Sequence, residues 1–285
     1  MDGPAAVLNL IKINKSFSGV PVLNDITLDI FPGEVHCIVG ENGAGKSTLI
    51  KIISGAYTRD SGTIIYRGET LSEIKPLWAR EHGINTIYQE IDMVPSLSAA
   101  ENIFLGNEPR TRWGNIDWGS VRQESERILE DMGAHLNLDI PVGRLKIAQQ
   151  QMVAIAKALS LKSRIIILDE PTAVFTKSEV DTLFRIVNRL KSQNIAILYI
   201  SHHMDEIFEI GDRVTVLRDG NLILTDCVKD IEKGALVKAM VGREIDFTQR
   251  NGSSSMGEEI FRVEGLSAPG SSQRINLCLH RGEIV

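Results

Sequence analysis

Hydrophobic positions along the chain follow two patterns that predict strands. Apolar and polar residues alternate over residues 8–13 and 26–30, as in strands with one buried face. Residues 165–168 and 195–200 are continuous apolar runs, typical of strands buried on both faces of a parallel sheet, and residues 35–39 form a largely apolar run that is also predicted to be a strand. The remaining predicted strands are residues 62–66, residues 84–88 and the hairpin 214–217 with 221–224, joined at Asp219-Gly220.

Segments with helical spacing lie between these strands. Residues 177–191 separate two of the continuous apolar runs and complete a βαβ unit. Residues 121–132 and 149–161 have no strand between them, so we expect residues 98–161 to form a helical insertion. Shorter helices are predicted at residues 49–53 and 236–241. Strands and helices that alternate in this way indicate an α/β fold.

Composition narrows the class of protein. With 43% hydrophobic and 24% charged residues, the 285-residue chain is predicted to be an ordinary soluble globular protein. The net charge of −6 provides no basic surface for nucleic acid. Cys37, Cys227 and Cys278 lack metal or redox spacing, so we expect buried thiols in a reducing compartment.

No apolar run approaches the ~20 residues that span a bilayer, and the N-terminus lacks signal-peptide features. We expect a cytosolic protein that reaches a membrane only through a partner.

A complete match to the phosphate-binding pattern G-x-x-x-x-G-K-[ST] follows the apolar run at residues 35–39. Its residues are Gly40, Glu41, Asn42, Gly43, Ala44, Gly45, Lys46, Ser47 and Thr48. Glycines let consecutive backbone N–H groups surround an anion, and the following helix N-terminus adds positive potential. Lys46 would reach the β- and γ-phosphates, and the Ser47 hydroxyl would hold Mg²⁺. On its own, the motif predicts only that a nucleoside triphosphate binds.

Two carboxylates, Asp169 and Glu170, directly follow the apolar run at residues 165–168. Open α/β sheets bind ligands at the carboxyl ends of their strands. Asp169 would support Mg²⁺ at the phosphates, and Glu170 would polarise a water for attack on the γ-phosphate. The alternative is an acidic cap before Pro171-Thr172, which is the weaker interpretation beside a phosphate-binding loop.

With both motifs in place, residues 7–245 resemble the ATP-binding cassette (ABC) family of transport ATPases. The resemblance implies a P-loop cassette with a mainly parallel core sheet. It also implies an N-terminal antiparallel β subdomain and a helical subdomain at about residues 90–161. In the family, a glutamine at the position of Gln89 senses the γ-phosphate through Mg²⁺ or the attacking water. His202 matches the histidine that contacts the γ-phosphate, and Phe17 matches the aromatic residue that stacks on adenine.

Each of these three residues also has a simpler interpretation. Gln89 alone would be a solvated loop residue, and Phe17 would be a core residue. His202 and His203 could form a metal site, but side chains of adjacent residues are expected to point apart, and no third ligand is near them in the sequence. Catalytic roles implied by the resemblance therefore fall on Lys46, Gln89, Glu170 and His202, and Mg²⁺ contacts on Ser47, Gln89 and Asp169.

Two segments depart from the family pattern. The signature L-S-G-G-Q, which faces the nucleotide of a second cassette, is replaced by Leu145-Lys146-Ile147-Ala148-Gln149. Lys146 lacks the serine hydroxyl, and bulk at the glycine positions should obstruct close packing. The segment Ala173-Val174-Phe175-Thr176 lacks the aspartate that contacts the dimer partner. Both departures lie in elements that face a partner's nucleotide, so we predict an asymmetric pair in which this P-loop forms the hydrolytic site.

The end of the chain repeats an earlier segment. Residues 275–284 align with residues 26–35 without a gap, with apolar residues at alternate positions and Gly-Glu before an aliphatic residue in both. Chance alternation of two strands is the alternative. We expect residues 1–250 to form a first ABC ATPase domain, residues 251–257 to be a linker, and residues 258–285 to be the truncated start of a second ABC domain.

Tandem cassettes, the degenerate signature and residues 94–106 together resemble the ABC subfamily that powers import of monosaccharides such as ribose, galactose or xylose. The resemblance implies an ATP-binding and hydrolysing subunit at the cytoplasmic face of the membrane. Its partners would be membrane permease subunits docked near residues 98–106, the second cassette and, indirectly, an external sugar-binding protein. The apolar residues of that docking segment could equally be core.

Two other classes of function remain open at this stage. One is a regulatory cassette that binds nucleotide without hydrolysing it. The other is a soluble tandem cassette ATPase that acts on ribosomes or nucleic acid. The acidic balance of the chain and the absence of a basic arm count against the second class, so we expect no nucleic-acid partner.

Overall fold

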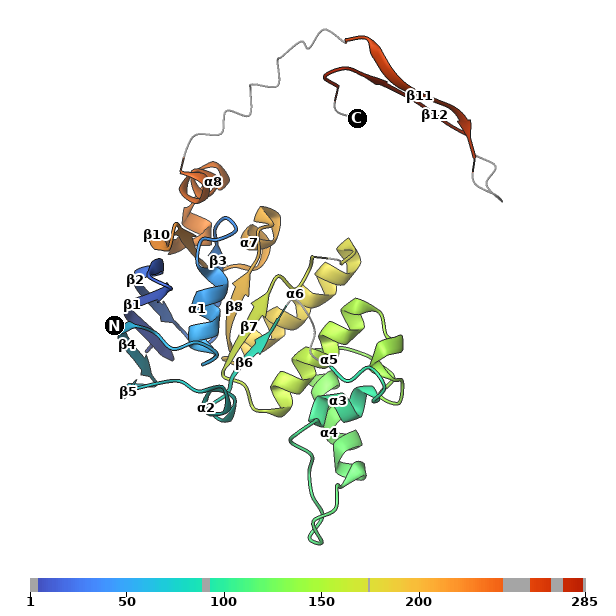
Figure 1. Ribbon diagram of the computed structural model, residues 1–285. Helices are drawn as coiled ribbons and strands as arrows, with labels where there is room; N and C mark the ends of the chain where they lie inside the picture. The colour runs from blue at the N-terminus through green and yellow to red at the C-terminus, as the bar shows by residue number, and fades with distance from the viewer. Residues whose placement is uncertain (1–4, 89–92, 174, 243–256, 268–273, 284–285) are drawn as a thin grey trace. The chain divides into compact units, whose positions relative to one another are not determined.

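The computed structural model describes residues 5–88, 93–173, 175–242, 257–267 and 274–283 (Figure 1). The chain divides into two units, residues 1–243 and residues 244–285. Within the described residues, no helix has both the length and the apolar composition needed to cross a bilayer.

A single sheet of ten strands organises the described part of the first unit, in the order β5-β4-β1-β2-β10-β9-β3-β8-β7-β6. Its half with β3, β6, β7, β8 and β9 is parallel. The half with β1, β2, β4 and β5 is antiparallel, and β10 joins the two halves. The strands are β1 Leu8–Phe17, β2 Val20–Ile30, β3 Val35–Val39, β4 Ser61–Tyr66, β5 Glu69–Leu71, β6 Ile84–Ile87, β7 Ile165–Asp169, β8 Ala196–Ile200, β9 Arg213–Arg218 and β10 Asn221–Cys227.

Eight α-helices and two short 3₁₀ helices are described in this unit. They are α1 Lys46–Ile53, α2 Pro76–Glu81, α3 Ala99–Phe104, α4 Trp118–Met132, α5 Ile147–Ser160, α6 Lys177–Ser192, α7 Met204–Ile210, α8 Lys233–Val241, η1 Val142–Arg144 and η2 Val228–Asp230. The prediction of an α/β fold with a mainly parallel core sheet, an antiparallel β region and a helical region is confirmed.

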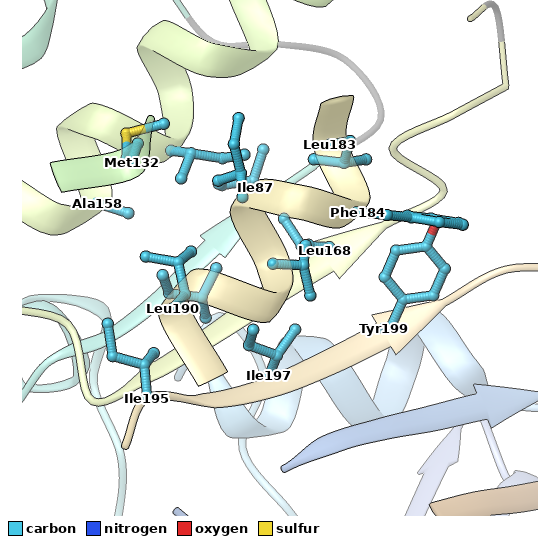
Figure 2. Close-up of a cluster of buried hydrophobic side chains, with 14 of the residues drawn as sticks. Ile87, Met132, Ala158, Leu168, Leu183, Phe184, Leu190, Ile195, Ile197 and Tyr199 are labelled. Carbon is cyan, nitrogen blue, oxygen red and sulfur yellow. The ribbon is translucent and has the colours of Figure 1, made fainter. Parts of the chain in front are cut away.

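The central strands are apolar throughout because both faces of the sheet are covered. Ile165 and Ile167 pack with α1 and the antiparallel strands, whereas Ile166 and Leu168 pack with α5 and α6. Figure 2 shows Leu183, Phe184 and Leu190 of α6 against Leu168, Ile197 and Tyr199 of the sheet. This double burial explains the continuous apolar runs and anchors the loops at the carboxyl ends of these strands.

The sequence patterns missed several short elements. β5, α2, α3 and α7 have three to seven residues, too few to establish a helical or strand period. α1 begins at Lys46, three residues earlier than predicted, so Lys46 and Ser47 occupy its first turn. Cys37 is buried as expected, but Cys227 and Cys278 are only half-buried, so the prediction of three buried thiols was wrong for these two.

In the second unit, β11 (Glu259–Leu266) and β12 (Ile275–His280) form an antiparallel pair. β12 confirms the strand predicted from the repeat, and β11 was not predicted. Phe261 pairs with Leu279, Val263 with Leu277 and Leu266 with Ile275. The register shifts between Val263 and Leu266, where Gly265 has a positive φ of 65°.

Candidate functional site

The loop from β3 to α1 depends on glycine for its shape. Gly40, Gly43 and Gly45 have φ angles of 154°, 86° and 101°. A Cβ atom on Gly40 would lie 2.1 Å from the Leu217 carbonyl oxygen, and one on Gly45 would lie 2.6 Å from Cδ2 of Leu23. Gly45 caps α1 without a side-chain hydrogen bond. The backbone N–H groups at the start of the helix are therefore suited to bind an anion.

Lys46 lies inside this loop and is only 8% exposed. Its Nζ atom donates to the carbonyl oxygens of Gly40 at 2.7 Å and Glu41 at 3.0 Å. Burial lowers the pKa of Lys46, while the carboxylates of Glu170 and Asp169 oppose that shift. A buried ammonium held only by neutral carbonyls is a strong site for anionic oxygens.

Asp169 ends β7, and Glu170 follows it with a left-handed φ of 48°. The Glu170 N–H donates to the Ile200 carbonyl at 3.0 Å. Burial raises the pKa of Asp169, and the charge of Glu170 raises it further. A cation bound between these carboxylates would relieve that repulsion. A non-glycine residue in this strained region is characteristic of functional sites.

His202 follows β8 and contacts Glu170. Its Nδ1 atom lies 3.2 Å from Glu170 Oε1. The ring centroids of His202 and His203 are only 4.1 Å apart, so the expectation that the two side chains point apart was wrong. Among the described residues, neither of the two clusters of potential metal ligands includes this pair. The geometry favours an interaction of His202 with Glu170 over a two-histidine metal site.

A cavity of about 460 Å³ lies between Lys46, Asp169 and Glu170, with a lining that comes from the loop, β2 and the carboxyl end of β7. The lining residues are Val22, Asn42, Gly43, Gly45, Lys46, Ser47, Thr48, Asp169 and Glu170. The donors fit a triphosphate with Mg²⁺, because N–H groups and Lys46 supply positive charge while Ser47 and Asp169 supply hard oxygen ligands.

Comparison with known proteins identifies the family. A family profile described as ABC transporter matches residues 23–173, more than half of the chain. The chain belongs to the ABC transporter family. It is 45% identical over 284 residues to the ribose import ATP-binding protein RbsA of Corynebacterium glutamicum, covering 99% of this chain and 53% of that relative. It is 44% identical over 285 residues to ribose import ATP-binding protein RbsA 2 of Rubrobacter xylanophilus, covering 99% of this chain and 55% of the relative.

A solved structure extends this similarity to the fold. The ADP conformation of MJ1267, an ATP-binding cassette of an ABC transporter, superposes with a TM-score of 0.74 at 25% identity. The alignment covers 84% of this chain and 100% of the other. The chain therefore contains a whole cassette fold, but it spans only about half the length of its curated relatives.

Phe17 lies at the end of β1, and the expectation that it could be a core residue was wrong. It is 41% exposed and makes an edge-to-face contact with Tyr57, with ring centroids 5.3 Å apart. Lys15 Nζ lies 5.2 Å from the Phe17 ring. Phe17 is absent from the lining of the ABC cassette's phosphate cavity. Its stacking on adenine therefore stays a prediction, in which the base would lie outside that cavity.

Gln89 lies outside the described residues, so its contacts with Mg²⁺ and water stay predictions. The segment after it, residues 98–106, is mostly core: Ala99, Ile103 and Phe104 are buried against α4 and α5. Phe104 is therefore a core residue, as in the alternative interpretation of this apolar segment, and permease docking near residues 98–106 stays a prediction. An adjoining groove of about 210 Å³ instead includes Tyr88, Met93 and Ala154 among its lining residues.

The degenerate ABC signature lies at the start of α5. Lys146 is the N-cap residue and is exposed, and Ile147 is 51% exposed. Ala148 is buried, so its methyl group fills space inside the cassette. Of the two residues that replace glycine, only Ile147 presents added bulk on the surface. In the loop after Glu170, Ala173 is exposed, and Val174 lies outside the described residues.

The motif search missed one carboxylate near the loops that carry Glu170 and His202. Glu206 of α7 accepts hydrogen bonds from the hydroxyls of Thr172, Tyr199 and Ser201. These donors lie on the loops after β7 and β8 and at the end of β8. The available signal was the acidic residue four positions after His202, but nothing in the sequence locates Thr172 beside it.

Proposed function

We propose that this cassette binds and hydrolyses ATP with Mg²⁺ to power sugar import through a membrane permease at the cytoplasmic face of the membrane. The observation that carries the proposal is the cavity that brings Lys46, Asp169 and Glu170 together, with His202 beside Glu170. The relatives' names, which specify ribose import, support a pentose or similar monosaccharide as cargo.

Six side chains and the backbone of the phosphate loop divide the work in this proposal. The N–H groups of Gly43 to Thr48 and the Lys46 ammonium hold the phosphates and stabilise charge in the transition state. Glu170 accepts a proton from, or orients, the attacking water. His202 contacts the γ-phosphate. Through its contact with Glu170, it also orients that carboxylate. Ser47 and Asp169, with Gln89, would hold Mg²⁺, which neutralises charge on the β- and γ-oxygens when bound.

Two substitutions test the hydrolytic roles. In the complete tandem protein, we expect Glu170→Gln to keep ATP binding but lower turnover by roughly 10²- to 10⁴-fold, because the carboxamide is no base. Glu209→Gln, on the exposed face of α7, is the matched control and should retain turnover. Lys46→Ala should weaken binding of a fluorescent ATP analogue by about tenfold or more in the 285-residue chain. Normal hydrolysis by Glu170→Gln would refute the proposed base.

A regulatory, non-hydrolysing role for this cassette makes a different prediction. If the proposal holds, Lys46→Ala abolishes most ATPase activity of the tandem protein, whereas the corresponding change in the second cassette leaves more of it. The reverse ranking would favour the regulatory role. Strong, salt-sensitive binding of the chain to nucleic acid would instead favour a ribosome- or DNA-directed ATPase.

The second unit supports a second cassette that begins at about residue 258. Four residue pairs of the β11–β12 ladder lie at positions that align with four pairs of the β1–β2 ladder. Phe261–Leu279 corresponds to Leu8–Ile30, Arg262–Cys278 to Asn9–Asp29, Val263–Leu277 to Leu10–Leu28, and Leu266–Ile275 to Ile13–Ile26. The bulge residues Lys12 and Gly265 both have positive φ. Their N–H groups donate to aligned side chains, Thr27 Oγ1 at 3.0 Å and Asn276 Oδ1 at 2.7 Å.

The turn after each hairpin supports the same assignment. Glu34 Oε1 accepts from the Phe31 N–H at 3.1 Å, and Glu283 Oε2 accepts from the His280 N–H at 2.9 Å. In this proposal, residues 1–250 are the first cassette and residues 251–257 the linker. The second cassette supplies the signature that completes this P-loop, while exposed Ile147 and Lys146 weaken the reciprocal site.

The permease is proposed to dock in the groove between β6 and α5. Tyr88 is 38% exposed at its edge, and Arg80 and Met93 line it. Thr86 also lines the groove. Crosslinking from a cysteine at Met93 to the permease, with one at Trp113 as the control, tests this placement.

A further inference from the structure

We infer that Glu206 is a positioning residue that fixes the distance between Glu170 and His202. This inference rests on the catalytic roles proposed above for these two residues. Glu206 lies on α7, which follows the loop that carries His202. None of the hydrogen bonds described for Glu206 joins it to Glu170 or His202. Its effect on their separation therefore passes through the two loops that carry them.

Each oxygen of the Glu206 carboxylate holds one loop. Oε1 accepts from Thr172 Oγ1 at 2.7 Å, and Thr172 lies two residues after Glu170. Oε2 accepts from Ser201 Oγ at 2.8 Å, and Ser201 lies directly before His202. Thr172 and Ser201 are 5% and 2% exposed, so water can rarely replace Glu206 as the hydrogen-bond acceptor of their hydroxyls. The carboxylate therefore acts as a bridge between the loop after β7 and the loop after β8.

A third hydrogen bond reaches Glu206 from the sheet and not from either loop. Tyr199 Oη donates to Glu206 Oε2 at 2.8 Å, and the Tyr199 side chain is fully buried within β8. Burial raises the pKa of the Tyr199 phenol, and the charge of Glu206 adds to that effect, so this hydroxyl remains a donor. Ser201 Oγ in turn accepts from the His203 N–H at 3.0 Å, which extends the bridge to the backbone after His202.

The backbone of Glu170 needs such support. Its φ of 48° is strained, and its N–H is satisfied by the carbonyl of Ile200, immediately before Ser201. A strained residue persists only where its surroundings hold it, and the hydrogen bond of Thr172 is the next restraint along the loop. Removing the bridge is expected to let Glu170 and His202 separate, because their 3.2 Å contact is exposed on the His202 side.

Thr172→Val and Tyr199→Phe form a matched pair for the test. Each removes one hydroxyl donated to Glu206 and keeps the shape of the side chain, so each should lower the unfolding temperature by a similar amount. Only Thr172→Val releases a catalytic loop. In the complete tandem protein, we expect Thr172→Val and Glu206→Gln to lower kcat by about tenfold or more, with KM for ATP nearly unchanged. Asp205→Asn, at an exposed neighbour paired with Lys233, is the activity control.

The structural readout is the separation of Glu170 Oε1 and His202 Nδ1 in a crystal structure of Thr172→Val. We expect it to exceed 3.2 Å while the hydrogen bonds of Lys46 to Gly40 and Glu41 persist. Equal losses of kcat in Thr172→Val and Tyr199→Phe, or an unchanged separation, would overturn the inference in favour of a purely structural network. If Glu170→Gln abolishes turnover and Thr172→Val does not lower it, only this inference fails. If Glu170→Gln retains turnover, the proposed function fails first.

Discussion

The two hairpins of this chain share a backbone design but differ in their surroundings. β1–β2 and β11–β12 have the same pairing over four residue pairs and the same Gly-Glu turn. Each also has a residue with positive φ at the same position of its bulge. Leu28 is 2% exposed, whereas its counterpart Leu277 is 36% exposed. In the first unit, α1 and the rest of the sheet cover the apolar face. The comparison indicates that pairing, bulge and turn are local properties, whereas burial depends on the rest of a cassette.

The largest expected difference between the hairpins concerns their apolar positions. Leu28→Ala should lower the free energy of unfolding by ~2–5 kcal/mol, because it leaves a cavity in a closed core. The matched change Leu277→Ala should cost less than ~1 kcal/mol in this chain, because Leu277 has no closed core around it. Urea unfolding of both variants gives the two values. Equal losses would mean that β11–β12 is covered in solution.

The glutamates of the two turns should differ next. Glu34 is 9% exposed, accepts from the Phe31 N–H and pairs with Arg213 Nη1 at 3.1 Å. Glu34→Gln should therefore cost ~1–3 kcal/mol, since it leaves the guanidinium without its charge partner. Glu283 bonds only within its own turn among the described residues, and Glu283→Gln should change chain stability little. Thermal unfolding measures both, and a larger loss from Glu283→Gln would reverse the comparison.

The bulge residues give a smaller effect of opposite sign. Lys12 has a φ of 51°, which costs free energy for a residue with a side chain, whereas the corresponding position of the second hairpin is Gly265. Lys12→Gly should raise the free energy of unfolding by about 0.5–1 kcal/mol, and Gly265→Ala should loosen the second hairpin. Amide hydrogen exchange in both hairpins distinguishes these outcomes. A destabilised Lys12→Gly would show that the lysine side chain supports the bulge.

The smallest effect is a pH dependence common to both hairpins. Hydrogen bonds from Lys15 and then Ser16 lower the pKa of Asp60 to about 2, and Arg262 lowers the pKa of Glu259 to about 2. A depressed folded-state pKa stabilises the fold above the carboxyl's unfolded value, and this contribution is lost as the pH falls toward 2. Carboxyl ¹³C titration should show both midpoints near 2. Because both pairs are exposed, 1 M salt should raise the midpoints. Titration of Asp60 near its ordinary value would exclude its bond to Lys15.

Several elements were predictable because their signals are local. Apolar runs identified β3, β7 and β8. Gly133 marked the end of α4, where it adopts a left-handed φ of 69°. Short elements such as α2 and α3 escaped detection because six residues hold less than two helical turns. The apolar residues at 98–106 left two interpretations open for a different reason: an apolar residue on a short helix has the same pattern whether a partner or the core covers it.

The sequence by itself determined the phosphate loop, the carboxylates at the end of β7, the strand periods and the strand that is repeated near the end, but not its partner β11. These features depend on φ preferences, side-chain periodicity and hydrogen bonds between close neighbours. Only the tertiary structure decided that Lys46 and Glu170 line one cavity with His202 beside Glu170, that Ala148 is buried while Ile147 is exposed, and that Glu206 joins two loops. Those facts depend on the order of β3, β8 and β7 in the sheet, which brings together segments up to 156 residues apart. No local pattern records that order, because each buried strand is apolar on both faces whichever neighbour it has.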